Sequence, residues 1–321
     1  MFSARCSPSV ICGSLLLYLC VATLANAADP ITHRLLAADS SKGHAMIINA
    51  AGETEWTFPI GPLHDIHYLN NGHVLLQNSW TNLVEVDPKS NKIVWEYDAA
   101  RGNGNEGKPL EVHAFQRLEN GNTMIAESGV SRIIEIDHDG KLQKQFPLQV
   151  KQPHPHRDTR LVRKLDNGNY LVCHEGDGIV REYSSDGKSV WEFAVPMFGE
   201  EPRPGHGPEA FGNQCFCALR FTSGNTLIST GNGHKVIEVT PNKEIVWQLT
   251  EADLTGIDLA WITTLQVLPN EHIVLVNCHA GPKNPQVIEV DRDKNVVWTF
   301  HDFERFGNAL TNVVVLPASS K

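Results

Sequence analysis

Histidine is the side chain in this chain best suited to chemistry, because an imidazole can act near neutral pH as a general acid or base, a nucleophile or a metal ligand. The sequence of 321 residues contains 15 histidines. His156 and Asp158 lie in the segment QPHPHRD, and His206 and Glu209 lie in GHGPEAFGNQ. A lone histidine in a loop is usually a hydrogen-bonding surface residue. The value of these side chains therefore depends on whether the fold brings them together.

The elements that must position them form a repeat. Leu165 to Phe193 has the pattern of three short strands, with turns at Asn167-Gly168 and at Asp186 to Lys188. At Asn167-Gly168 we expect a type I′ turn, in which both central residues have positive φ. The same pattern recurs with a period of about 47 to 56 residues, which is typical of four-stranded propeller blades. In most copies a tryptophan on the last strand is expected to pack between blades.

The number of copies predicts how the chain closes on itself. The first copy, His33 to Phe58, has three strands and lacks the innermost one, whereas Leu310 to Pro317 has the pattern of an innermost strand with nothing after it. A last strand that completes the first blade would close the ring and remove its open edges. We predict an all-β, six-bladed β-propeller, formed as a single domain by residues 28–321.

One position of the repeat is expected to place polar and ionisable side chains near the central channel of the propeller. It lies eight residues before the turn of each first hairpin, near the start of the innermost strand. The residues at this position, one per blade, are His64, His113, Arg160, Phe216, Thr263 and Thr311. The first three, His64, His113 and Arg160, come from adjacent blades, so we expect them to converge at the mouth of the central channel, on the face that carries the long loops.

The long-loop face supplies the candidate site residues. As catalytic candidates we select His113, Arg160, His174, His206, His234 and His279. As ligand-binding candidates we select His64, His67, His156, Asp158, Glu175, Glu209, Trp261, Asn284 and Gln286. Two alternatives stay open: Arg160 could form a structural ion pair with Asp158 or Glu175, and Asn284 and Gln286 could satisfy only loop backbone.

Several chemistries fit such a face. Neutral imidazoles suit a divalent metal, and three of them with an open position would resemble a catalytic metal site. A histidine could also serve as general acid or base, or as a nucleophile with arginine steadying an anionic group. The sequence contains no H-E-x-x-H, G-x-S-x-G, P-loop or dinucleotide fingerprint. We predict a pocket for a small anionic or carbohydrate-like ligand, in a transferase, lyase or hydrolase; the alternative is a non-catalytic module that binds a ligand or another exported protein.

The first 27 residues are expected to be a signal peptide. Arg5 precedes the apolar run Ile11 to Leu24, and Ala25-Asn26-Ala27 is a cleavage pattern. We therefore expect a secreted or periplasmic protein, with no membrane span after cleavage and monomeric in solution. The formal net charge of −10 makes nucleic acid a poor partner.

Four of the seven cysteines lie beyond the expected cleavage site, at Cys173, Cys215, Cys217 and Cys278. Their spacing is typical of neither a zinc ribbon nor a disulfide scaffold. We expect buried free thiols.

The repeat Leu-x-Asn-Gly-Asn…Gly-Lys-x-Val-Trp-x-Phe resembles that of the PQQ-like β-propellers and the related arylsulfotransferase-type propellers. Leu165 to Phe193, Leu118 to Phe146 and Val84 to Tyr97 carry this resemblance, which spans the mature chain. Quinoprotein dehydrogenases have eight blades and an adjacent cysteine pair, whereas Phe216 separates Cys215 from Cys217, so PQQ is not expected as cofactor. Arylsulfotransferases use histidine and arginine at the channel mouth, in kind like His113 and Arg160. They also carry an N-terminal domain for which this chain is too short.

Overall fold

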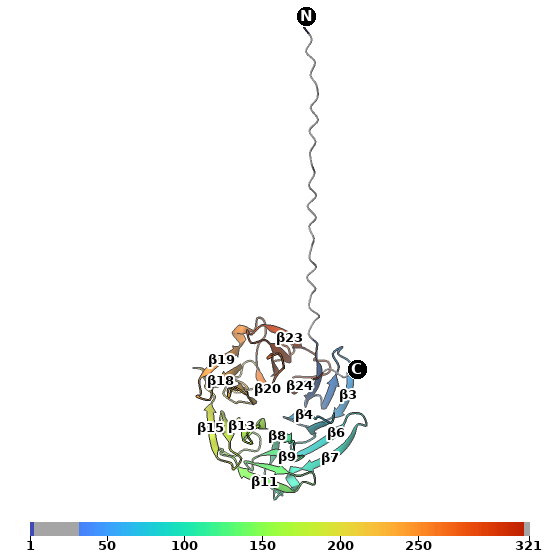
Figure 1. The fold of residues 1–321 in the computed structure, drawn as a ribbon, viewed down its shortest axis with the longest axis vertical. Coiled ribbons are helices and arrows are strands. Elements are labelled where there is room, and N and C mark those ends of the chain that lie inside the picture. Colours follow the sequence, from blue (N-terminus) through green and yellow to red (C-terminus); the bar gives the residue numbers. More distant parts are fainter. Residues whose placement is uncertain (3–31, 318–321) are drawn as a thin grey trace. The chain divides into compact units, whose positions relative to one another are not determined.

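The computed structural model describes residues 1–2 and 32–317. The predicted signal peptide lies, apart from its first two residues, outside them. Six antiparallel sheets of four strands each stand around a central axis (Figure 1). The predicted six-bladed β-propeller is therefore confirmed.

Each blade is one sheet, named here from its innermost strand outward. Blade one contains β24 (Leu310–Leu316), β1 (Arg34–Asp39), β2 (His44–Ile48) and β3 (Thr54–Pro59). Blade two contains β4 (Ile66–Tyr68), β5 (Val74–Gln77), β6 (Asn82–Asp87) and β7 (Lys92–Asp98). Blade three contains β8 (Glu111–Arg117), β9 (Thr123–Ser128), β10 (Arg132–Ile136) and β11 (Leu142–Pro147).

The second half of the ring repeats this arrangement. Blade four contains β12 (Val162–Lys164), β13 (Tyr170–His174), β14 (Ile179–Tyr183) and β15 (Ser189–Ala194). Blade five contains β16 (Ala218–Arg220), β17 (Thr226–Ser229), β18 (Lys235–Val239) and β19 (Ile245–Thr250). Blade six contains β20 (Trp261–Val267), β21 (Ile273–Cys278), β22 (Val287–Val290) and β23 (Val296–Phe300).

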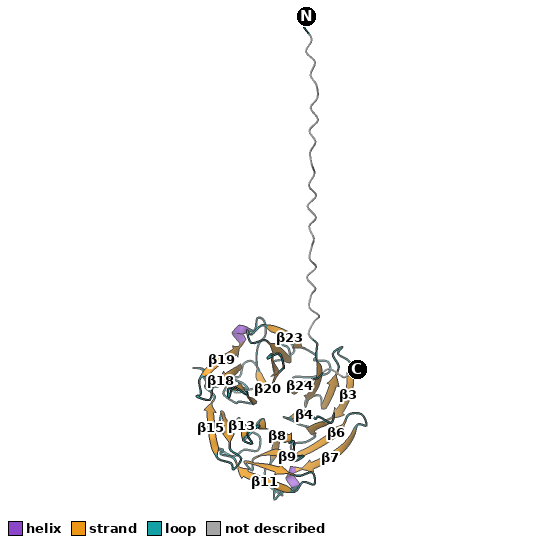
Figure 2. Ribbon diagram, viewed as in Figure 1, coloured by secondary structure: helices purple, strands orange, loops and turns teal. Residues whose placement is uncertain are grey.

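Helix is confined, among the described residues, to two short 3₁₀ segments on the rim, η1 (Ala99–Arg101) and η2 (Glu251–Asp253) (Figure 2). Neither they nor any other part of the described chain forms a helix that could span a bilayer.

Ring closure occurs as predicted. β24 pairs antiparallel with β1, and Arg34 lies opposite Leu316 (Figure 1). The last described strand thus fills the innermost place of the first blade, and both of its neighbours in the ring are complete sheets.

The hairpin turns differ from the predicted type I′ geometry. In blade four the amide of Gly168 donates to the carbonyl of Leu165, so Asp166 and Asn167 are the central residues. Only Gly168 has positive φ, 83°. This is the arrangement of a three-residue hairpin loop, a turn followed by one left-handed residue. The Asn-Gly signal located the turn correctly and indicated the wrong type, because the asparagine caps the loop through its side chain, accepting from the amide of Asn169.

Neighbouring blades are joined by side chains of the outer strands. The indole N–H of Trp95 donates to the carbonyl of His138 in the next blade, and that of Trp247 donates to the carbonyl of Arg292. A glutamate on the third strand of five blades also pairs with a basic residue of the following blade: Glu85 with Arg117, Glu135 with Lys164, Glu182 with Arg220, Glu238 with Arg292, and Glu289 with His33. The tryptophans therefore join blades, as predicted. The four cysteines are buried and unbonded, also as predicted.

Candidate functional site

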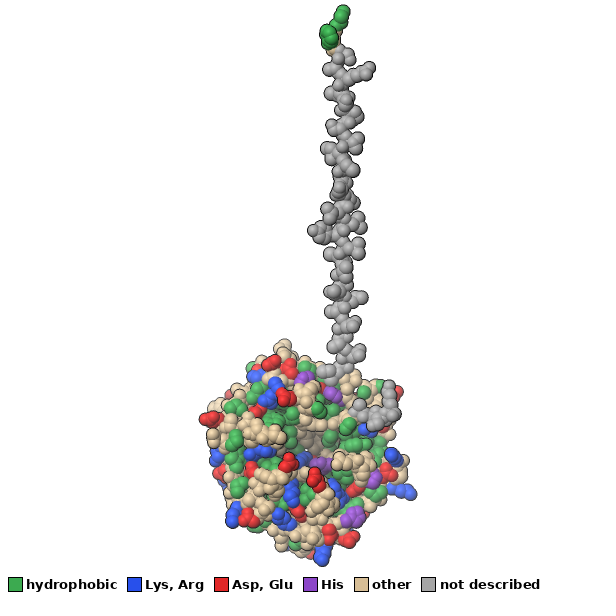
Figure 3. Space-filling model, in the orientation of Figure 1, with side chains coloured by type: hydrophobic (Ala, Val, Ile, Leu, Met, Phe, Trp, Pro, Cys, Tyr) green, Lys and Arg blue, Asp and Glu red, His purple; other side chains and the backbone are tan. Residues whose placement is uncertain are grey.

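A cavity of about 310 Å³ lies at the mouth of the channel on the long-loop face. The middle of the ring is hollowed in the space-filling view (Figure 3). The lining of the cavity comes from blades one, two and six and from the linkers that precede blades two, four and five: Ser40, Thr311, His64, Trp80, His156, Arg160, His206, Phe216, Trp261, Thr263 and His279. Five of the six residues at the repeat position near the innermost strands line it directly. The sixth, His113, contacts the ring of His64 with 4.6 Å between centroids.

One long loop, between β15 and β16, reaches over the mouth. It runs from blade four to blade five, yet the ring of His206 lies 4.6 Å from Trp261 and 5.3 Å from His279, both in blade six. Arg203 and Phe211 exchange backbone hydrogen bonds that hold the loop in shape. The loop therefore contributes an exposed imidazole to the cavity without closing it.

Arg160 is the cation of the cavity, and its charge is balanced. Its guanidinium forms an ion pair with the buried carboxylate of Glu175, and it donates to the carbonyl of His156. The open alternative of an ion pair with Glu175 is thus what the structure shows. An incoming anion would have to compete with that carboxylate for Arg160, so the charge of Arg160 alone gives the cavity little attraction for anions.

Beside the cavity, the imidazoles of His113 and His156 both contact the same carboxylate oxygen of Glu111. Oε2 of Glu111 lies 2.9 Å from Nε2 of His113 and 2.7 Å from Nδ1 of His156. Nδ1 of His113 lies 2.8 Å from the carbonyl oxygen of Thr159, which can only accept a hydrogen bond. Each of the three side chains offers one atom that could ligate a metal ion, and these three atoms all lie within 4.8 Å of one another.

Burial disfavours the charged form of four imidazoles in and beside the cavity, those of His64, His113, His206 and His279. Burial and the charge of Arg160 lower the pKa of His113 to about 4 and bring the pKa of His64 well below its usual range. Burial also lowers the pKa of His206 and of His279, and each lies near another cation or imidazole. For Glu111, burial would raise the pKa, but hydrogen bonds from His113 and His156 outweigh it and bring the pKa to about 2. Neutral imidazoles can accept protons or bind metal.

Two of the predicted catalytic residues lie away from the cavity. His174 is fully buried, with Nδ1 2.8 Å from the carbonyl of Asp158 and Nε2 2.9 Å from the hydroxyl of Tyr183. His234 is also buried, beside Phe211 and 3.8 Å from Glu251. Neither side chain lines the cavity, and the structure offers no contact between them and a ligand bound there.

His67 lies deeper in the channel. It lines a second hollow of about 200 Å³ together with Asp65 and Arg163. The guanidinium of Arg163 binds both carboxylate oxygens of Asp65 at 2.8 Å, joining blades two and four. This ion pair stands among the innermost strands, so His67 belongs to the channel wall rather than to the mouth.

The remaining polar candidates form hydrogen bonds that hold loops in place. Asp158 accepts from the amide of Gly129 and the hydroxyl of Ser131. Asn284 donates to the carbonyl of Ala280, and Gln286 donates to the carbonyl of Gly307. The open alternative for Asn284 and Gln286, that they satisfy loop backbone, is the one the structure shows.

Glu209 is exposed on the loop between β15 and β16, its carboxylate near Gly205 and Gly207. It lies outside the cavity lining.

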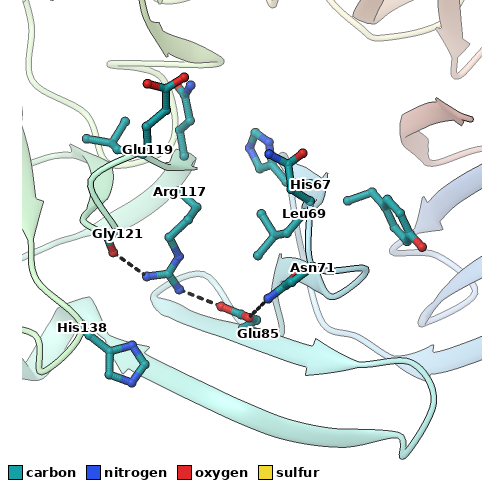
Figure 4. Close-up of a pocket in the computed structure, with 12 residues that line it drawn as sticks. His67, Leu69, Asn71, Glu85, Arg117, Glu119, Gly121 and His138 are labelled. Atoms are coloured by element: carbon teal, nitrogen blue, oxygen red, sulfur yellow. Dashed lines mark hydrogen bonds and ion pairs between the residues drawn. The ribbon is translucent and has the colours of Figure 1, made fainter.

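A larger hollow, of about 600 Å³, lies on the opposite, short-turn face (Figure 4). Two of its charged residues, Arg117 and Glu85, form an ion pair with each other. Arg117 binds Glu85 and the carbonyl of Gly121, and Asn71 donates to the same glutamate. The hollow is a groove between blades two and three in which Arg117, Glu85 and Asn71 bind one another.

Sequence reasoning missed Glu111. The residue stands two positions before His113 on the same strand, β8. Because side chains two apart on a strand share a face, the pattern Glu-x-His was a usable signal. The cavity also includes Ser40, Cys278 and Ala309, for which the sequence holds no comparable signal.

Six sheets of four strands around one axis define the class of the protein as a six-bladed β-propeller. The chain belongs to the family described as outer membrane protein assembly factor BamB, whose profile matches residues 41–300. The PQQ-like part of the predicted resemblance is therefore confirmed, and the arylsulfotransferase-type part stays a prediction. No curated protein matches the chain.

Solved structures show the same fold at low sequence identity. A protein of unknown function from Bacteroides caccae is 21% identical, with a TM-score of 0.71, covering 88% of this chain and 98% of that one. The virginiamycin B lyase of Staphylococcus aureus is 13% identical, with a TM-score of 0.54 over 84% of this chain and 85% of that one. The WD40 propeller domain of Doa1 is 15% identical, with a TM-score of 0.53 over 75% and 71%. At these identities the similarity is one of fold.

Proposed function

We propose that the protein binds a small, oxygen-rich ligand of carbohydrate-like chemistry in the cavity at the channel mouth. The observation that carries this proposal is the convergence of imidazoles, threonine side chains and two indoles, those of Trp80 and Trp261, on one cavity of about 310 Å³. Indoles offer apolar area to the ring of a sugar, and imidazoles and hydroxyls exchange hydrogen bonds with its hydroxyl groups.

The charge of the site favours a neutral ligand over an anion. Glu175 balances Arg160, and Glu111 adds a further negative charge beside the cavity. A neutral imidazole can also take a proton from a bound hydroxyl group, so His206 and His279 remain candidates for a general base. Binding and turnover are therefore measured together.

The test is a binding screen of neutral sugars, uronic acids and sulfate esters by calorimetry, with product analysis for every ligand that binds. His206→Ala should weaken binding of each true ligand about tenfold, since it removes one hydrogen-bonding group from an exposed loop without touching the core. His138→Ala, which alters an exposed histidine on the opposite, short-turn face, is the matched control and should bind as wild type does.

Two results would contradict this proposal. Equal affinity in wild type and His206→Ala would place the ligand elsewhere. Binding confined to uronic acids and sulfate esters would instead support the anionic ligand class.

A second candidate function, binding of another protein, is favoured by the outer strands. Val94, Val190 and Val246 are about half exposed, one on the outermost strand of each of three blades. These strands also leave one edge unpaired, which can accept a strand from a partner. The family description names an assembly factor, consistent with such contacts. Val190→Lys should abolish co-purification of a partner held there, and should leave sugar binding unchanged.

We also propose that the protein is exported. The apolar run Ile11 to Leu24 followed by Ala25-Asn26-Ala27 supports this, as does the outer membrane named in the family description. Amino-terminal sequencing of the protein from the periplasm or medium should begin at Ala28. An intact Met1 on protein recovered from the cytoplasm would overturn the proposal.

A further inference from the structure

We infer that Glu111, His113 and His156 form a binding site for a divalent transition metal at the edge of the mouth cavity. The inference goes beyond the proposed function, because it concerns a metal rather than an organic ligand. It uses the proposed site only in that the cavity would supply the open coordination position.

The donor set has the composition of a catalytic metal site. Two imidazoles and one carboxylate, with a further position open to ligand or water, hold zinc in several hydrolases and Fe²⁺ in oxygenases. Here the three donor atoms lie within 4.8 Å of one another, and His156 also lines the cavity. In tetrahedral zinc coordination two ligand atoms stand about 3.3 Å apart. The present separations of 2.7 and 2.9 Å need to open only slightly.

The hydrogen bonds around His113 orient it as a ligand. The carbonyl of Thr159, which can only accept, lies 2.8 Å from Nδ1 of His113. In the metal-bound arrangement Nδ1 therefore carries the ring proton and donates to this carbonyl. Nε2 then presents a lone pair to Oε2 of Glu111, which is itself an acceptor. A carbonyl that fixes the ring tautomer in this way is the usual outer partner of a metal-bound histidine. A cation between Nε2 and Oε2 satisfies both acceptors.

Arg160 offers the opposing arrangement. Its Nη1 lies 2.7 Å from Nδ1 of His113 and also donates to the carbonyl of His156. If Nη1 donated to Nδ1, the ring proton would sit on Nε2 and bind Glu111 without a metal. The Glu175 carboxylate, paired with Arg160, offsets the repulsion between the guanidinium and a metal ion. Titration with metal distinguishes the arrangement with the ring proton on Nδ1 of His113 from the one with the proton on Nε2.

The probes are Co²⁺ and Zn²⁺ alone, titrated into purified untagged protein after treatment with chelator. Co²⁺ binding is followed by visible absorption and Zn²⁺ binding by calorimetry. We expect one ion per chain, with affinity reduced at least about 100-fold in His156→Gln and in Glu111→Gln, since loss of a ligand costs more than loss of an outer-shell partner. His156 is on a partly exposed linker, so its replacement spares the fold.

His279→Gln is the matched control, because it alters the same cavity outside the three ligands; its metal affinity should stay within about threefold of wild type. The inference is overturned if wild type takes up no ion at micromolar concentration, or if the ligand variants bind as wild type does. Sugar binding repeated in the presence of chelator tests the proposed function separately, so either result can fail alone.

Discussion

At the scale of single residues, burial keeps several histidines neutral. This lowers the stability of the folded protein at acidic pH. His174 is the clearest case. Burial lowers its pKa to about 4 from the ordinary 6.5, while Asp158 and Tyr183 complete its hydrogen bonds. In the folded protein the imidazole of His174 stays neutral at pH values at which the same side chain is protonated in the unfolded chain. Between pH 6.5 and 4 the unfolded chain therefore gains protons that the folded chain does not, and stability falls as the pH falls.

His174→Gln should remove this part of the pH dependence. We expect the free energy of unfolding of wild type to lose up to about 3 kcal/mol more than that of the variant between pH 7.5 and 4. Above pH 7 the difference between the two proteins should be constant. Urea denaturation at a series of pH values measures it, and parallel curves over the whole range would show that His174 titrates normally.

The residue scale is also where prediction from sequence was weakest. The repeat position placed His64 and Arg160 at the mouth, because strand order alone fixes where an innermost strand begins. It could not show that His174, at the end of β13, would turn inward to Tyr183. Side-chain direction at a strand end depends on the packing of the neighbouring linker, which leaves no pattern in the sequence. Glu111 was missed although its spacing from His113 was readable.

At the scale of elements, blades two to six share the same hairpin between their two innermost strands, and blade six departs from it at one residue. Gly72, Gly121, Gly168 and Gly224 have φ between 83° and 90° in their turns. Glu271 occupies the corresponding place in blade six with φ of 66°. A residue with a side chain is strained in the left-handed region. The hairpins themselves were predictable, since turn residues recur at a fixed period, but the turn type depended on side-chain caps.

Glu271→Gly should therefore stabilise the protein, by about 0.5–1 kcal/mol, because relief of the strain exceeds the added entropy of a glycine in the unfolded chain. The matched change is Gly168→Ala in blade four, where the added methyl group meets no atom within 4 Å and only the backbone strain is introduced. It should destabilise by about 1 kcal/mol. Denaturant midpoints compare the two, and changes of the same sign would refute the reasoning.

At the scale of the whole molecule, stability depends on the pairing of β24 with β1. The closed ring was predicted from the missing strand of the first copy, because an unpaired inner edge is costly wherever it occurs. Strand β24 also forms hydrogen bonds with residues that line the cavity at the channel mouth. Asn312 donates to the carbonyl of His64, and Thr263 donates to the carbonyl of Thr311. The same strand that closes the ring thus holds part of the cavity wall.

Removing β24 by ending the chain at residue 309 should abolish cooperative unfolding. A circular permutant is the control: a short linker joins residue 317 to residue 33, and new ends open at the exposed turn of Asn167 and Gly168. Arg34 and Leu316 are paired across the sheet, so the linker spans a short distance. The permutant should unfold in one transition near the wild-type midpoint, as measured by calorimetry. A stable truncated chain would show that closure is dispensable.

A chain synthesised from its amino end presents β1 to β3 of blade one first and β24 last among its described strands. Until β24 arrives, His64 lacks the amide that holds its backbone, and Ala38 faces no strand on its inner side. A product cut short by a late stop codon would carry nearly every residue of the cavity and still be unable to assemble it. The cavity is therefore complete only after β24 has been synthesised and paired with β1.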